Sequence, residues 1–164
     1  MKIKVLVVGC GDRATVYCHE GVDNLKQMQV VAAVDPNPER LRYMRENFRV
    51  AENMCFDNIH DVLALGKIAD AVINGTMDSL HLATAVPFLE QGYHMLLEKP
   101  LVNNKADLLY LKSVAEQNNV KLMTCHVLRY APFYRKVKEL IASGTIGKVQ
   151  NIQTSERVGA YHSS

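Results

Sequence analysis

The sequence predicts an α/β fold in which helices cover both faces of a doubly wound, mostly parallel sheet. Short apolar runs rich in β-branched residues alternate with helical patterns over residues 1–125, and the connections between them are short. A chain that repeats strand and helix in this way forms parallel strands joined by crossover helices. A glycine-rich turn, Gly9-Cys10-Gly11-Asp12-Arg13-Ala14, directly follows the first apolar run. The alternation and this turn together indicate an open, doubly wound sheet.

Six strands are expected, each short and apolar enough to be buried on both faces. They are Ile3–Val8, Val30–Val34, Met54–Phe56, Ala69–Ile73, His94–Leu97 and Lys121–Thr124. Pro38 is placed to open one of the intervening helices, and Asn58 and Ser79 can cap two others. Gly66 and Gly92 supply C-terminal stops. The helices expected on this basis are Arg13–Met28, Pro38–Asn47, Ile59–Leu65, Ser79–Gln91 and Asn104–Asn118.

The pattern changes after residue 125. A helix begun by Pro132 is expected over Ala131–Ala142, and Lys148–Arg157 alternates like the first strand of a different sheet. We therefore interpret residues 1–125 as the doubly wound domain. Residues 126–164 are expected to form a connecting helix and only the start of a second, truncated α+β domain.

The composition is that of a soluble globular protein, with 48% hydrophobic and 22% charged residues and a formal net charge of +2. Acidic and basic residues are interspersed, so no nucleic-acid partner is expected. No segment approaches the ~20 apolar residues that span a bilayer, so no membrane association is expected. The N-terminus leads straight into a strand without a cleavage site, which favours a cytoplasmic protein. The four cysteines show no CxxC spacing, so reduced thiols and no metal site are expected.

The glycine turn has the chemistry of a dinucleotide site. Gly9 allows a tight turn out of the strand, Gly11 lets backbone approach a pyrophosphate, and Ala14 lets the next helix pack closely. The helix N-terminus, which includes Asp12 and Arg13, then faces the phosphates. A lone G-x-G-x-x-A is weak evidence. Here it follows a buried strand, opens a helix and precedes an acidic residue at the end of the second strand, so the context predicts a Rossmann-type nucleotide-binding domain.

Asp35 is that acidic residue. Its carboxylate can accept both ribose hydroxyls of adenosine and would repel a 2′-phosphate, which favours NAD over NADP. The alternative is a structural Asx turn leading into Pro36. Arg40 lies close enough in sequence to soften the discrimination. An S-adenosylmethionine site would also fit Asp35, but it does not fit the next motif.

Glu98-Lys99-Pro100 ends a later strand, at the edge where open α/β sheets hold their ligands. Proline locks the backbone after the strand and holds Lys99 in place. A lysine beside a nicotinamide is suited to proton transfer or substrate orientation. The alternative is a solvated loop lysine beside a salt-bridged glutamate.

With these motifs in order, the sequence resembles the N-terminal part of the Gfo/Idh/MocA oxidoreductases, which include glucose–fructose oxidoreductase and inositol dehydrogenases. The resemblance covers nearly the whole chain. Besides the glycine turn and Glu98-Lys99-Pro100, it is carried by Val34-Asp35-Pro36, Thr76-Met77-Asp78-Ser79-Leu80-His81, Gly92-Tyr93-His94-Met95-Leu96-Leu97, Arg129-Tyr130-Ala131-Pro132 and Ile141-Ala142-Ser143-Gly144-Thr145-Ile146-Gly147.

The resemblance implies a role for the matching cofactor-side residues. Thr76 would line the adenosine and pyrophosphate side, and His81 would lie near the nicotinamide end, although Met77 stands where the family usually has proline. Glu98 and Lys99 would flank the nicotinamide ribose and the substrate, with Lys99 the catalytic lysine. The alternative for His81 is a helix-start histidine satisfied by backbone groups.

The resemblance also implies which residues would lie near the substrate and what the second domain would do. Arg129 would lie near the substrate pocket, or would instead clamp its own turn through bidentate hydrogen bonds. His162 would be a substrate-side residue where the second domain continues, and otherwise a frayed terminus. The family's second domain would build a pocket for a sugar, cyclitol or related polyol, and its sheet would support a homo-oligomer.

Two functional hypotheses follow. In the first, the chain is the N-terminal portion of an NAD-dependent dehydrogenase that moves a hydride between nicotinamide and a sugar, cyclitol or polyol. In the second, it is a module that binds NAD and is catalytically incomplete because the substrate domain is absent.

Overall fold

The computed structural model describes residues 1–155. The chain divides into two compact units, Met1–Cys125 and His126–Ser164. The strands of the first unit are β1 (Ile3–Val8), β2 (Met28–Val34), β3 (Cys55–Phe56), β4 (Ala71–Asn74), β5 (His94–Leu97) and β6 (Leu122–Thr124). Its α-helices are α1 (Asp12–His19), α2 (Pro38–Phe48), α3 (Ile59–Ala64), α4 (His81–Glu90) and α5 (Lys105–Gln117).

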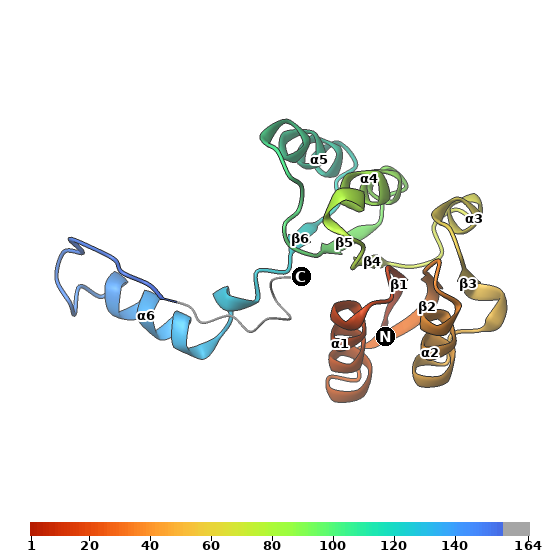
Figure 1. Ribbon diagram of the computed structural model, residues 1–164, viewed down its shortest axis with the longest axis horizontal. Helices are drawn as coiled ribbons and strands as arrows, with labels where there is room; N and C mark the ends of the chain where they lie inside the picture. The colour runs from red at the N-terminus through yellow and green to blue at the C-terminus, as the bar shows by residue number, and fades with distance from the viewer. Residues whose placement is uncertain (156–164) are drawn as a thin grey trace. The chain divides into compact units, whose positions relative to one another are not determined.

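The six strands form one parallel sheet in the order β3-β2-β1-β4-β5-β6. From β1 the chain moves outward through β2 and β3, then crosses back and moves outward on the other side through β4, β5 and β6. Helices α1 and α2 lie against one face, and α3, α4 and α5 against the other (Figure 1). The doubly wound Rossmann-type fold is therefore confirmed. The strand order reverses between β1 and β4, and ligands of such sheets bind at the carboxyl ends beside this reversal.

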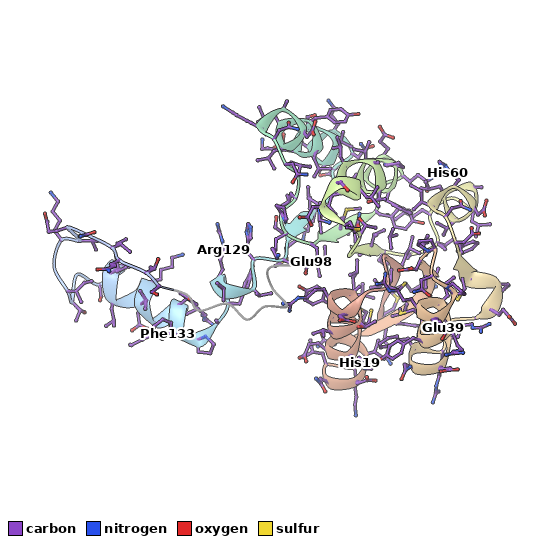
Figure 2. All side chains as sticks on the ribbon, in the orientation of Figure 1. His19, Glu39, His60, Glu98, Arg129 and Phe133 are labelled. Atoms are coloured by element: carbon purple, nitrogen blue, oxygen red, sulfur yellow. The ribbon has the colours of Figure 1, made fainter. Side chains whose placement is uncertain are left out.

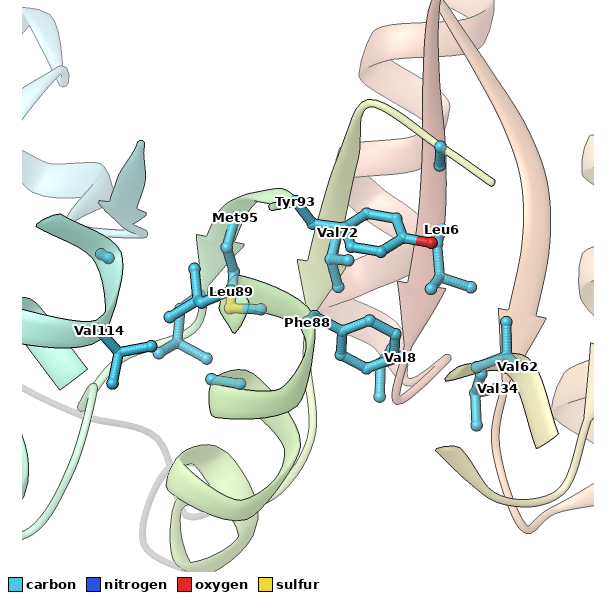
Figure 3. Packing of buried hydrophobic residues seen from close by; sticks show 14 of the residues in the cluster. Leu6, Val8, Val34, Val62, Val72, Phe88, Leu89, Tyr93, Met95 and Val114 are labelled. Atoms are coloured by element: carbon cyan, nitrogen blue, oxygen red, sulfur yellow. The ribbon is translucent and has the colours of Figure 1, made fainter. Parts of the chain in front are cut away.

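Strand β1 supplies side chains to the cores on both faces of the sheet, because successive side chains of a strand alternate. Toward α4, Leu6 and Val8 join a cluster that includes Phe88, Leu89 and Tyr93 (Figure 3). Toward α1 and α2, Val5 and Val7 join a second cluster, with Ala14, Cys18 and Met44. Each fully buried aliphatic side chain of this kind contributes about 1.5–3 kcal/mol to folding. The near-continuous apolar run of β1 is the sequence signature of this two-sided burial.

Local capping rules predict the starts of α2 and α3. Pro38 is the first residue of α2, and the Asn37 side chain accepts the N–H of Glu39. Asn58 caps α3 by accepting the N–H groups of His60 and Asp61. The bounds of most other elements also agree with the sequence pattern to within a residue or two of each end.

The predicted cap at Ser79 is wrong. The chain enters α4 through a short 3-10 turn, Asp78–Leu80, so Ser79 already lies inside a helical turn. The residues that precede the turn and the helix are Met77 and Leu80, and neither has a capping side-chain hydrogen bond.

The first helix is also shorter than predicted. Instead of running to Met28, α1 ends at His19 and continues as a wider π-helical turn, Glu20–Asn24. Within this turn Gly21 packs closely on Met28, because a Cβ there would lie 2.7 Å from the Cε of Met28. The chain has to reverse at this point, since Met28 already pairs with Ile3 in the sheet.

The second unit contains a 3-10 turn at Val127–Arg129 and helix α6 (Pro132–Ala142). Pro132 opens α6 as expected, and Phe133 extends from it (Figure 2). The strand predicted at Lys148–Arg157 is wrong for its described part, because residues 148–155 adopt no strand. A strand is held by ladder hydrogen bonds, and none is formed in that part of the chain.

No helix within residues 1–155 combines the length and the apolar character needed to cross a membrane.

Candidate functional site

The carboxyl edge of the sheet gathers the residues that the sequence analysis singles out. At the ends of the strands, the sheet's parallel hydrogen bonding extends into the turns and holds them in register. The bonds are Gly9 N to Val34 O (2.9 Å), Asp35 N to Phe56 O (3.0 Å), Gly75 N to Val8 O (2.8 Å) and Glu98 N to Asn74 O (3.0 Å). The glycine turn therefore lies between the turn that carries Asp35 and the turn that carries Thr76.

Gly9 brings two of these turns into contact. Its φ is +77°, and a Cβ there would lie 2.6 Å from the backbone nitrogen of Thr76. On the same contact, a Cβ on Gly75 would lie 3.1 Å from that of Ala14. The turn after β4 thus closes directly on the glycine turn, and position 9 accommodates only glycine.

The N-terminus of α1 is open to a ligand. Gly11 precedes the helix with extended backbone and no capping side chain. A Cβ on Gly11 would meet only the Cζ of Arg40, at 4.0 Å among the described residues. Asp12 and Arg13 are exposed in the first turn. Because the first N–H groups of a helix have no partner within it, they are available to a phosphate, aided by the helix dipole. These residues fit the pyrophosphate of a dinucleotide.

Asp35 directly follows β2, and only 1% of its surface is exposed. Its Oδ1 accepts the N–H of Asn37 at 2.9 Å, and its Oδ2 accepts the N–H of Cys10 at 2.8 Å. The Nη1 of Arg40 also lies 3.4 Å from Oδ2. The Asx turn considered as the alternative for Asp35 is therefore formed, and the same carboxylate also holds the glycine turn. Its predicted role toward the ribose of a cofactor stays a prediction.

His81 joins the turn after β4 to the turn after β5. The imidazole is fully buried, with Nε2 3.0 Å from Thr76 O and Nδ1 2.7 Å from Pro100 O. The Thr76 hydroxyl donates to Oδ1 of Asn74 at 2.8 Å, which holds the same turn from its other side. The alternative given for His81, a helix-start histidine whose ring nitrogens are hydrogen-bonded to backbone groups, therefore describes its contacts. Direct contact of His81 with a cofactor stays a prediction.

Glu98, which Figure 2 labels, is buried at the end of β5, and its carboxylate accepts hydrogen bonds from two sides. Tyr17 of α1 donates from Oη to Oε1 at 2.5 Å, and the N–H of Lys99 donates to Oε2 at 3.0 Å. Burial, reinforced by the hydrogen bond to Glu98, raises the pKa of the Tyr17 phenol. Burial also raises the pKa of the neighbouring Cys125 thiol to about 11. The Lys99 side chain itself is exposed.

Tyr17 and Cys125 belong to this site but carry no motif in the sequence. Tyr17 lies 81 positions from Glu98, so no local motif links the two residues. One signal was available: Tyr17 comes three residues after Ala14, and residues at that spacing share a face of a helix. Because Ala14 packs against the sheet, Tyr17 was placed to reach the turns at its edge.

The predicted substrate residues belong to the second unit. Arg129 ends the 3-10 turn there and is exposed. His162 lies outside the described residues. Within residues 1–155, no group of three or more His, Cys, Asp and Glu side chains is placed to hold a metal ion.

A parallel sheet with a glycine turn at its strand-order reversal, an uncapped helix N-terminus and an acidic residue ending β2 defines a dinucleotide-binding domain. A family model described as "Oxidoreductase family, NAD-binding Rossmann fold" matches residues 3–126. The chain belongs to this family, Gfo/Idh/MocA, and its first unit is an NAD-binding Rossmann domain.

Individual relatives are similar at a lower level. The chain is 29% identical to Oxidoreductase P35 of Formosa agariphila over 87% of this chain and 44% of that protein. It is 26% identical to the myo-inositol 2-dehydrogenase of Thermotoga maritima over 94% of this chain and 45% of that one. Among solved structures, the WlbA dehydrogenase of Bordetella pertussis in complex with NADH and UDP-GlcNAcA superposes with a TM-score of 0.81. That match is 26% identical and covers 90% of this chain and 44% of the other. The chain thus spans less than half the length of these relatives.

Proposed function

We propose that this chain forms the cofactor-binding half of an oxidoreductase that transfers a hydride between nicotinamide and a sugar, cyclitol or related polyol. One observation carries the proposal. Lys99 directly follows Glu98, and Glu98 is hydrogen-bonded to α1, the helix whose N-terminus lies at the glycine turn. The lysine that would transfer a proton is thereby linked to the element that would bind the cofactor's pyrophosphate.

Each group of residues would have its own role in binding or catalysis. Gly9, Gly11 and the first turn of α1 would hold the pyrophosphate, and Glu98 would fix the start of the turn that carries Lys99. The cofactor, when bound, supplies the hydride acceptor or donor. The exposed ammonium of Lys99 is free to orient a substrate hydroxyl and to exchange a proton with it.

The substrate class is supported by similarity and by chemistry. One relative is named a myo-inositol 2-dehydrogenase, and another was crystallised with a nucleotide sugar. A carbinol carbon is the group from which a nicotinamide cofactor accepts a hydride, and sugars and cyclitols present several. The predicted role of Arg129 at the substrate belongs to this proposal.

The first test is a titration of the chain with NADH, followed by cofactor fluorescence. Saturable binding is expected, with NADH preferred over NADPH because a carboxylate ends β2. A matched titration of Gly11→Val places a branched side chain where the pyrophosphate would lie and is expected to abolish binding. A folded chain that binds no NADH would refute the proposal.

The second candidate, an NAD-binding module without turnover, is favoured by the exposure of Lys99, because proton transfer is favoured in sites that exclude water. Reduction of NAD by myo-inositol separates the two functions when it is assayed with the chain joined to the C-terminal remainder of a relative, such as the myo-inositol 2-dehydrogenase of Thermotoga maritima. Turnover that Lys99→Ala removes and the control Lys105→Ala retains supports the enzyme. Saturable NADH binding without turnover supports the module.

A further inference from the structure

The amino-terminal edge of the sheet carries a cavity, at the opposite end of the strands from the candidate cofactor site. Its volume is about 480 Å³, and it lies where β1 and β2 begin, beside the turn that follows α1 and the end of α2. Its lining consists of Lys2, Val22, Asp23, Met28, Gln29, Val30, Asn47, Phe48 and Arg49. None of these residues belongs to the site described above.

The cavity combines an apolar interior with a charged rim. Val30 and Phe48 are buried core residues. Lys2, Asp23 and Arg49 are exposed around them. An apolar lining with a few polar groups, in a cavity of a few hundred Å³, is the usual form of a site for a small molecule.

The charges around this cavity do not pair with one another. Asp23 lies instead against His19, which Figure 2 labels on α1, with Oδ2 2.6 Å from Nδ1. Neither Lys2 nor Arg49 takes part in an ion pair within residues 1–155. The other arginines of α2 are paired with carboxylates, and they are Arg40, Arg42 and Arg45. The rim therefore offers both signs of charge to a molecule that carries both.

Arg49 has a backbone conformation that arginine rarely adopts. It directly follows α2 with φ +57° and ψ +33°, in the left-handed region. Glycine is the usual residue at this place after a helix, because it has no Cβ to clash. The last turn of α2 already contains Arg45, so the helix end has its stabilising cation without Arg49. An arginine held in a strained conformation beside a cavity indicates a role for its side chain.

We propose that this cavity binds an α-amino acid with an apolar side chain. Arg49 and Lys2 bind its carboxylate, Asp23 binds its ammonium group, and the side chain packs on Val30 and Phe48. A guanidinium is suited to this role because it binds a carboxylate through two parallel hydrogen bonds. The proposal shares no residue with the cofactor site, so either of the two can fail without the other.

The test is a titration of the isotope-labelled chain with L-leucine, followed by the NMR signals of its backbone amides. Saturable shifts are expected in residues 22–30 and 47–49. Isocaproate lacks the ammonium group of leucine and isopentylamine lacks its carboxylate. Each should bind at least about tenfold more weakly, because one charged hydrogen-bonded group is lost. The absence of saturable shifts, or equal binding of leucine and isocaproate, would overturn the proposal.

Arg49→Gly and Lys26→Gly form a matched pair of variants. Both residues have a positive φ, +57° and +56°, but Lys26 does not line the cavity. Each glycine should raise the urea midpoint, because it removes the same kind of backbone strain. Only Arg49→Gly should weaken leucine binding, by about tenfold or more. Unchanged binding in Arg49→Gly, or an equal loss in both variants, would refute the role of Arg49. Arg49→Asn repeats the test if the glycine variant does not fold, since asparagine tolerates this conformation.

Asp23→Asn tests the contact with the ammonium group. Asparagine keeps a polar partner for His19 but carries no charge. Leucine binding should weaken about tenfold, whereas the binding of isocaproate should not weaken. An equal loss for both molecules would show that Asp23 acts on the shape of the cavity and would refute its proposed contact.

Discussion

Tyr17 on α1 donates a 2.5 Å hydrogen bond to Glu98 at the end of β5, across 81 positions of sequence. The bond joins the helix of the glycine turn to the turn that carries Lys99. Since the N–H of Lys99 donates to the other oxygen of the same carboxylate, Glu98 lies between the two parts of the site. One buried carboxylate and its phenol donor therefore link the glycine turn to the lysine.

Removal of the Tyr17 hydroxyl is expected to destabilise the first unit. Tyr17→Phe keeps the ring but leaves the buried carboxylate without its phenol donor, which costs about 1–3 kcal/mol of unfolding free energy. Urea denaturation measures the loss. Tyr110→Phe is the control, because Tyr110 is exposed on α5 and the change should have little effect. Equal midpoints for the two variants would show that the bond does not stabilise the fold.

Two glycine substitutions separate the cost of a left-handed backbone conformation from the cost of a steric clash. Gly9 and Gly66 both have positive φ, +77° and +71°, but a Cβ on Gly66 meets nothing within 4 Å in the described chain. Gly66→Ala should therefore cost only the left-handed backbone conformation, about 1–2 kcal/mol. Gly9→Ala adds the 2.6 Å approach to Thr76 N, so it should cost clearly more and also abolish NADH binding. Thermal unfolding and the NADH titration measure both effects. Similar losses in the two variants would contradict the close contact of the two turns.

Loss of His81 is expected to loosen both turns that it joins. His81→Ala removes the partner of two backbone carbonyls and leaves a cavity in a fully buried position, which should cost about 2–5 kcal/mol. Hydrogen exchange should show faster exchange in the turns around Thr76 and Pro100. The control His60→Ala changes an exposed histidine on α3. Unchanged protection in both turns would show that the imidazole does not hold them.

Alkaline pH is expected to destabilise the first unit. Burial raises the pKa of Cys18 to about 12 and that of Cys125 to about 11, from an ordinary value of 9.0. A thiol whose pKa is higher in the folded chain binds its proton more tightly when folded. The stabilisation is therefore complete below pH 9 and is lost as the pH rises toward the folded-state values.

Urea midpoints at about pH 8 and about pH 10.5 measure this loss, and Cys18→Ala should reduce the difference between them. A midpoint that does not change over this interval would show that the buried thiols do not contribute.

Much of the fold could be predicted because its signals are local. Pro38 opens α2 and Asn58 caps α3, and both signals act within a few residues; the apolar run of β1 reflects its burial on both faces. The end of α1 could not be predicted, because the chain has to reverse before Met28, which pairs with Ile3 in the sheet. The predicted strand after α6 failed for a related reason. An alternating pattern forms a strand only where a neighbour supplies hydrogen bonds.

The sequence by itself determined the glycine turn, the acidic end of β2 and the Glu98-Lys99-Pro100 turn, because each motif is contiguous and its chemistry follows from adjacent residues. Only the tertiary structure decided which partners these residues have. Tyr17 binds Glu98, His81 joins the turns of Thr76 and Pro100, and Arg40 covers Asp35. The sheet creates these pairings by bringing the carboxyl ends of separate strands to one edge, and spacing along the chain does not encode them.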